Sequence, residues 1–195
     1  MSSSSARLVI SVAVTCVVAA GGLAATYSVT APRIAAQERD AEQRALKRVL
    51  PEAARFEALD EKSVAEAAAS VTAGEVEAVW KAVDASGSDA GWCIKTSARG
   101  YGGPVRMVIG LDRNGKVSGL TILAMNETPG LGTRVESEPW FMRQFLDLPP
   151  GYGERDVKQM DAISGATRSS KAVKNCVTAA GQAFAALSSG KAVSQ

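Results

Sequence analysis

Residues 105–124 read VRMVIGLDRNGKVSGLTILA, and this stretch decides the fold. Its two halves, residues 105–111 and 117–124, are short apolar runs rich in β-branched side chains, which is typical of strands. Asn114-Gly115 lies between them, and Asn-Gly is the strongest short signal for a hairpin turn. The stretch therefore predicts two antiparallel strands joined by a tight turn.

The residues on the N-terminal side of this hairpin continue the strand pattern. It begins near Val64, has Val76, Ala78 and Trp80 alternating with Glu77 and Lys81, and is interrupted by a loop at residues 86–91. Residues 92–98 then form a further predicted strand. The domain should thus be built on several consecutive antiparallel strands.

Helical patterns follow the hairpin. Residues 139–146 predict a short helix, and residues 169–187 predict a longer one, because apolar side chains recur there at three- and four-residue spacing. Antiparallel strands followed by a packing C-terminal helix define an α+β domain.

The N-terminal segment has a different character. No charged side chain occurs between Arg7 and Arg33, and a helix of about 20 residues is enough to cross a hydrocarbon core. We expect a transmembrane helix over residues 8–29. A cleaved signal peptide is the alternative, but the apolar run exceeds the usual length of such a signal and has no clean Ala-x-Ala cleavage site.

Residues 34–49 predict a charged helix, which Leu50-Pro51 should end. The expected organisation is therefore a tail over residues 1–7, a membrane helix over 8–29, a stalk or linker over 30–62, and a domain over 63–190.

Composition excludes several classes of function. The chain has 22 Lys+Arg against 20 Asp+Glu and therefore no basic footprint for nucleic acid. It contains no His and only 3 Cys, which removes histidine-based catalysis, histidine-ligated haem and four-thiolate metal centres. We expect no metal site and no catalytic residue, so redox chemistry would need an organic cofactor. Cys93 and Cys176 could form a disulfide or remain buried thiols.

The first motif of interest is residues 126–133, NETPGLGT. Pro129-Gly130 predicts a tight turn, and Gly132 permits close approach of the backbone to a neighbour. Leu131 is presented from this loop. Taken alone, an ordinary turn after a strand is the simpler explanation.

The second motif is residues 161–167, DAISGAT, which leads into the final helix. Ser164, Thr167 and Ser169 are candidate caps of that helix. Its first-turn amides and dipole favour an anion, and Arg168 and Lys171 add positive charge. The pattern fits a phosphate group near Thr167 and fits a capped helix without a ligand equally well.

The two motifs together, ETPGLG at 127–132 and DAISGATRSS at 161–170, resemble the FMN-binding domain of the G subunit of the Rnf electron-transport complex. The N-terminal span and the segments at 34–39 (IAAQER) and 49–53 (VLPEA) extend the resemblance over most of the chain. The C subunit of the sodium-translocating NADH:quinone oxidoreductase carries similar motifs, but the compact length favours the Rnf subunit.

The resemblance implies that Thr167 carries FMN as a phosphoester, attached by a flavin transferase that uses FAD. Asp161 matches the family's acidic residue three positions before the Ser. Glu127 is expected to accept a hydrogen bond from the cofactor or simply to fix the turn, and Tyr101 and Arg106 are weaker candidates. The further expected contacts to FMN are Ser164, Gly165, Ala166, Arg168, Thr128, Pro129, Gly130, Leu131 and Gly132.

The implied function is electron relay, without a substrate of its own, in an ion-translocating ferredoxin:NAD oxidoreductase complex. The expected partners are the other subunits, a flavin transferase during maturation and the lipid bilayer. The expected location is a bacterial or archaeal cytoplasmic membrane, with a single span and the C-terminal domain on the extracytoplasmic side. Alternatives are the NADH:quinone oxidoreductase subunit, a tethered binding or assembly module without electron transfer, and a secreted flavoprotein.

Overall fold

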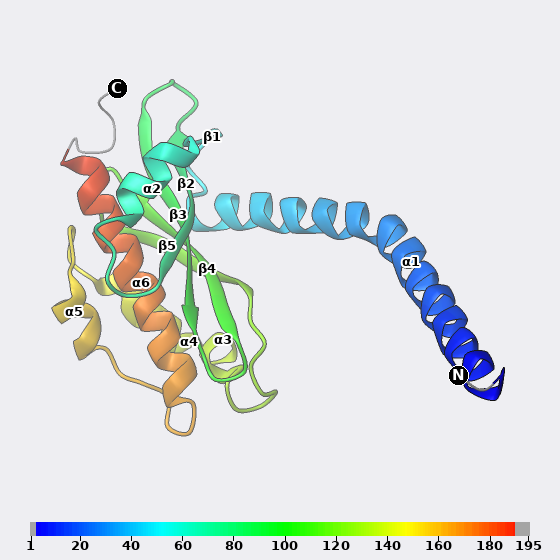
Figure 1. The fold of residues 1–195 in the computed structure, drawn as a ribbon. Coiled ribbons are helices and arrows are strands. Elements are labelled where there is room, and N and C mark those ends of the chain that lie inside the picture. The colour runs from blue at the N-terminus through cyan, green and yellow to red at the C-terminus, as the bar shows by residue number, and fades with distance from the viewer. Residues whose placement is uncertain (1–2, 190–195) are drawn as a thin grey trace. The chain divides into compact units, whose positions relative to one another are not determined.

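A five-stranded antiparallel sheet is the centre of the domain. The computed structural model describes residues 3–189 (Figure 1). The strands pair in the order in which they occur in the chain, so the sheet is a meander. They are β1 (Arg55–Ala58), β2 (Glu75–Val83), β3 (Asp89–Arg99), β4 (Pro104–Asp112) and β5 (Val117–Ala124).

Helices precede the sheet, interrupt it once and follow it. The α-helices are α1 (Ser3–Val49), α2 (Glu61–Ala68), α3 (Arg134–Ser137), α4 (Pro139–Arg143), α5 (Glu154–Gln159) and α6 (Thr167–Ser188), and a 3-10 helix, η1, spans Gln144–Asp147. The α+β class predicted from the sequence is confirmed, including the long apolar N-terminal helix and the C-terminal packing helix.

The hairpin at residues 105–124 forms as its sequence predicts. β4 and β5 pair antiparallel, with Gly110 opposite Gly119. In the turn, Gly115 has a φ of 79°, and the Asp112 carboxylate accepts hydrogen bonds from the amides of Asn114 (2.8 Å) and Lys116 (2.9 Å). The Asp-x-Asn-Gly sequence therefore supplies both the left-handed residue and the acceptor that close the turn.

The sheet buries apolar side chains on both faces. Met107 and Ile109 of β4 belong to the cluster that includes Val177 of α6, and Figure 1 shows α6 lying across that face. Val108, which points to the opposite side, packs in a second cluster with Leu46 of the last turns of α1. This alternation follows from the two-residue period of a strand.

Helix α1 contains the predicted membrane segment. It ends at Val49, directly before Leu50-Pro51, as predicted, and Pro32 lies inside it. Within residues 3–189 one helix is long and apolar enough to cross a membrane, and it is this one, which is consistent with single-pass anchoring. The described residues up to Glu42 form one compact unit, and those from Gln43 onward form a second unit that contains the sheet.

Several local expectations were wrong. The strand pattern near Val64 is helix α2, whose N-terminus is capped by the Asp60 carboxylate on the amide of Ser63 (3.3 Å). Strand β1 was not predicted, because four residues with one partly buried side chain give little pattern. The predicted helix at residues 139–146 divides into α4 and η1.

The two cysteines of the domain are free thiols. Cys93 packs with Leu46 and Trp80 in the cluster that contains the end of α1, and Cys176 packs in the cluster under α6. Burial raises the pKa of each thiol to about 12. The structure thus selects the free-thiol alternative over the disulfide.

Candidate cofactor pocket

The two sequence motifs meet in space and line one cleft. Its volume is about 530 Å³, which lies within the range of small-molecule sites. The residues that line it are Tyr101, Glu127, Thr128, Leu131, Gly132, Gly165, Ala166, Thr167, Arg168 and Ser169. Most of the predicted cofactor contacts are therefore brought together, although the two motifs are far apart in the sequence.

The ETPGLG loop is a compact turn that follows β5. The Thr128 carbonyl accepts hydrogen bonds from the amides of Leu131 (3.1 Å) and Gly132 (3.0 Å). Leu131 is 46% exposed, and a Cβ added at Gly165 would lie 3.4 Å from its Cδ1 atom. The leucine side chain thus lies against the second motif and at the same time faces solvent at the cleft.

Glu127 lines the cleft and is buried. Its Oε1 atom accepts a hydrogen bond from the amide of Tyr101 (2.8 Å), and its Oε2 atom accepts one from the hydroxyl of Ser169 (2.9 Å). A Cβ at Gly132 would lie 2.5 Å from Oε2, which explains why glycine stands there. The carboxylate therefore ties the ETPGLG loop to the loop before β4 and to the first turn of α6.

Helix α6 begins at Thr167 with Ala166 in the N-cap position and has no side-chain cap. The prediction that Ser164, Thr167 and Ser169 cap it was wrong. Ser169 donates its hydroxyl to Glu127 instead, because it is buried against that carboxylate. A long helix with no side-chain cap presents its first amides and the positive end of its dipole to whatever occupies the cleft.

Positive charge lies beside this helix start. Arg168 places its guanidinium carbon 5.9 Å from the centre of the Tyr101 ring, within the range of a cation–π contact. The Tyr101 side chain is itself 67% exposed, so the pair forms an accessible rim. Lys171, one turn further on, is exposed as well. The positive charge on this rim favours an anionic group next to the start of α6.

Four predicted contact residues do not line the cleft: Asp161, Ser164, Pro129 and Gly130. Asp161 is exposed, and its amide and carbonyl are both held by the Gln144 side chain, at 2.8 and 3.1 Å. Arg106 also lies outside the cleft and pairs with Glu77 (3.0 Å) on the surface of the sheet.

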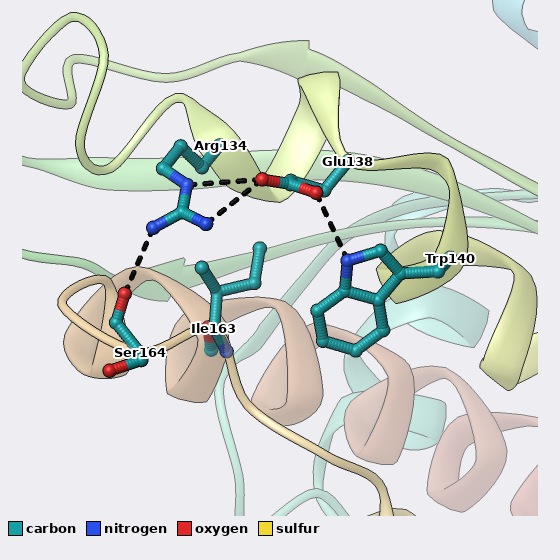
Figure 2. A network of polar contacts seen from close by, with 6 residues as sticks. Arg134, Glu138, Trp140, Ile163 and Ser164 are labelled. Atoms are coloured by element: carbon teal, nitrogen blue, oxygen red, sulfur yellow. Dashed lines mark hydrogen bonds and ion pairs between the residues drawn. The ribbon is translucent and has the colours of Figure 1, made fainter.

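Sequence reasoning missed a polar network that holds the second motif, shown in Figure 2. Arg134 donates from Nη1 to the carbonyl of Ser164 (3.0 Å) and pairs through Nη2 with Glu138 (2.9 Å). Hydrogen bonds from Arg134 and then from Trp140 lower the pKa of the Glu138 carboxyl. The four-residue spacing of Arg134 and Glu138 indicates an ion pair, but no local pattern indicates the bond to Ser164.

Comparison with known proteins agrees with this arrangement. Residues 100–182 match the FMN-binding domain family, and residues 1–49 match the RnfG N-terminal region family. The first match contains the whole cleft, and the second ends where α1 ends.

Full-length relatives give the same result. The chain is similar to the G subunit of the ion-translocating oxidoreductase complex of Methanosarcina acetivorans, with 31% identity over 177 residues, covering 89% of this chain and 91% of the relative. It is 33% identical over 181 residues to the G subunit of the Na(+)-translocating ferredoxin:NAD(+) oxidoreductase complex of Acetobacterium woodii, covering 88% and 87%. The corresponding proton-translocating complex of Clostridium ljungdahlii has a G subunit that is 28% identical over 184 residues, covering 91% and 90%. The chain therefore belongs to the family of G subunits of Rnf-type ion-translocating oxidoreductase complexes, and it carries that family's FMN-binding domain.

Proposed function

We propose that this chain is a membrane-anchored flavoprotein subunit that relays electrons through FMN esterified to Thr167. The proposal rests on the family membership and, above all, on one observation: Thr167 is an exposed residue at the start of α6 and lines the cleft. FMN, when bound, supplies the electron chemistry that the side chains of this protein do not offer.

The cleft has the features that a phosphate-anchored flavin needs. The first amides of α6, its dipole and the Arg168 guanidinium favour a phosphodiester anion beside Thr167. The Leu131 side chain and the aromatic ring of Tyr101 line the same cleft, and they would exclude water from part of a ring system there. Attachment through phosphate leaves such a ring chemically unmodified.

The attachment reaction that we propose needs FAD and a flavin transferase. The Thr167 hydroxyl oxygen forms a bond to the FMN-side phosphorus of FAD, the pyrophosphate bond breaks, and AMP leaves with the bridging oxygen. The hydroxyl proton passes to a base of the transferase or to water. The step is a phosphoryl-group transfer without change of redox state, so the flavin arrives in its place unmodified.

Co-expression with a flavin transferase tests the attachment. After full denaturation, wild-type protein should fluoresce in the gel under ultraviolet light, and Thr167→Ala should not. Thr121→Ala, at a half-buried position of β5 that does not line the cleft, is the matched control and should fluoresce like wild type. A fluorescent Thr167→Ala band, or a dark wild-type band in a host with an active transferase, would contradict the proposal.

We assign Leu131 to shielding of the flavin rather than to its attachment. Leu131→Ala should keep covalent FMN but shift its reduction potential and increase solvent quenching of its fluorescence. If potential and quenching both match wild type, Leu131 is only a turn residue. If attachment is lost, the loop belongs to what the transferase recognises.

We further propose that the flavin domain faces the extracytoplasmic side and works beside other subunits of an Rnf-type complex. The support is family membership, the apolar helix α1 and the names of the relatives, which describe them as complex subunits. Protease added to intact spheroplasts should degrade the domain, with a cytoplasmic protein as the protected control. Protection of the domain until lysis would show the opposite orientation.

A further inference from the structure

We infer that Arg134 is a positioning residue that holds the attachment loop, residues 164–167, in the geometry needed for esterification of Thr167. The inference rests on the proposed function, because it concerns how Thr167 is presented to the transferase. Arg134 does not line the cleft and is not assigned contact with the cofactor. It acts through the backbone of the loop.

The guanidinium joins two segments that are distant in the sequence. Its Nη1 atom donates to the Ser164 carbonyl (3.0 Å), while Nε and Nη2 both donate to Oε1 of Glu138 (3.1 and 2.9 Å). Figure 2 shows the side chain lying between these two acceptors. The second oxygen of Glu138 accepts from the indole nitrogen of Trp140 (3.1 Å), so the carboxylate that orients Arg134 is itself held.

The attachment loop needs this hydrogen bond to fix its conformation, because the residue that follows Ser164 is a glycine. Gly165 has a φ of 82°, and glycine is the residue whose backbone rotates most freely. The segment before it is already held by side chains: Gln144 bonds both backbone groups of Asp161, and the Ser170 hydroxyl accepts from the amide of Ile163 (3.0 Å). The bond from Arg134 is made at the last carbonyl before Gly165, inside the turn that the Ala166 amide closes on the Ile163 carbonyl (2.9 Å).

The same contact also links the two motifs. Arg134 is the first residue of α3 and follows the ETPGLG loop almost directly. The Arg134–Ser164 bond therefore fixes the distance between that loop and the start of α6, next to the buried Glu127–Ser169 bond. Lateral movement of the attachment loop would break it.

The contribution of this network to overall stability should be small. The side chains of Arg134 and Glu138 are 38% and 31% exposed, and ion pairs with this exposure stabilise proteins little. A substitution at Arg134 should thus leave the fold intact and affect the loop alone. Lysine at this position would keep the charge but lose the planar fork that bonds two acceptors at once.

The test compares Arg134→Met and Arg134→Lys with wild type, using the full-length chain in detergent. Arg106→Met is the matched control, because it removes the same kind of Arg–Glu pair from a residue that does not line the cleft. The first measurement is the initial rate of FMN attachment with purified transferase and FAD, read by in-gel fluorescence. The second is amide hydrogen exchange over residues 164–168 in the absence of flavin. Thermal unfolding checks the fold.

We expect Arg134→Met to be esterified about 10-fold more slowly or worse, since small misplacement of a reacting group has large kinetic effects. Arg134→Lys should lie between this variant and wild type, and Arg106→Met should match wild type. The KM for FAD should stay unchanged, because FAD binds to the transferase. Amides 164–168 should exchange faster in Arg134→Met, while the melting temperatures of all variants remain close.

An attachment rate for Arg134→Met equal to that of wild type would overturn the inference, and so would unchanged exchange over residues 164–168. If wild type itself acquires no flavin, the proposed function fails, and the exchange measurement alone then decides whether Arg134 holds the loop. A slow rate together with a large loss of melting temperature would also count against it, because it would assign Arg134 to the fold.

Discussion

Glu127 shows how one side chain can set the geometry of the whole cleft. Its two oxygens have separate donors, the Tyr101 amide and the Ser169 hydroxyl, in a buried position. From the sequence, the carboxylate could either bind the cofactor or fix the turn. The observed bonds show that the carboxylate fixes the loop, since each oxygen binds a protein group that lines the cleft, and its contact with a cofactor stays a prediction.

We predict that Glu127→Ala destabilises the domain by roughly 1–3 kcal/mol, because it leaves the part-buried Tyr101 amide and the buried Ser169 hydroxyl without their acceptor. Glu127→Gln should destabilise the domain less, since the glutamine oxygen can accept a hydrogen bond from the Tyr101 amide and its NH2 group can donate one to the Ser169 hydroxyl. Urea unfolding followed by tryptophan fluorescence measures both. An alanine variant as stable as the glutamine variant would show that the two bonds contribute nothing.

The buried thiols give a second prediction at this scale. A pKa of about 12 for Cys93 and Cys176 leaves a thiolate fraction of only about 10⁻⁴ at pH 8, and the thiolate is the reactive form. In a Cys16→Ser chain, a thiol reagent at pH 8 should therefore label nothing until denaturant is added, and then two groups. Rapid labelling of one thiol in the native protein would place it in an accessible site.

At the scale of elements, the contact between the last turn of α1 and the β4–β5 pair depends on two glycines. A Cβ at Gly110 would lie 2.6 Å from the Val49 carbonyl oxygen, and one at Gly119 would lie 2.8 Å from the same atom. These glycines face each other across the two strands. They let a helix backbone lie directly on the sheet.

Gly110→Ala should therefore destabilise the domain by about 1–3 kcal/mol, because backbone rather than a flexible side chain has to move. Gly103→Ala is the control: a Cβ there meets nothing closer than 3.4 Å, so its effect should be within about 0.5 kcal/mol. Denaturant midpoints of the two variants give the comparison. Equal midpoints would mean that the end of α1 adjusts freely.

The elements that the sequence predicted are those whose signal is local. These signals are the Asn-Gly pair in the turn at residues 114–115, Pro51 just after the end of α1, and the three- and four-residue spacing of apolar side chains in α6. The ETPGLG and DAISGAT motifs indicated a shared site only through their family resemblance. Helix α2 was read as a strand because Ala and Val residues there have no strong period, and its Asp60 cap was overlooked.

The missed contacts that join the separate segments of the site are long-range. Glu127 and Ser169 are 42 residues apart, and Arg134 and Ser164 are 30 residues apart. Such bonds depend on how α3 and α6 pack against the sheet, and a single sequence does not encode that packing as a readable pattern. The role of Gly110 and Gly119 could not be predicted from the sequence either, because it depends on their contact with α1, which precedes them by many residues.

At the scale of the whole molecule, the end of α1 belongs to the core of the domain. Leu46, Val49 and Leu50 are almost fully buried and pack with Trp80 and Val108. Burying a leucine or valine contributes about 1.5–3 kcal/mol. Loss of all three is comparable to the entire stability of a typical domain, which is about 5–15 kcal/mol.

A chain that lacks residues 1–42 should therefore be soluble and unfold cooperatively. A chain that lacks residues 1–53 should aggregate or have a much lower melting temperature. Size-exclusion chromatography and thermal unfolding distinguish them. Equal melting temperatures for the two chains would show that the second apolar cluster is dispensable.

The order of the strands also limits how the domain can be moved between proteins. The FMN-binding match starts at residue 100, yet β1, β2 and β3 all precede that point, and Ile94 of β3 packs in the same cluster as Val177 of α6. A fragment of residues 100–182 would keep one hairpin and lose most of the surface on which α6 rests. A portable flavin-bearing tag cut from this protein would accordingly have to begin near Gln43 and run through the end of α6.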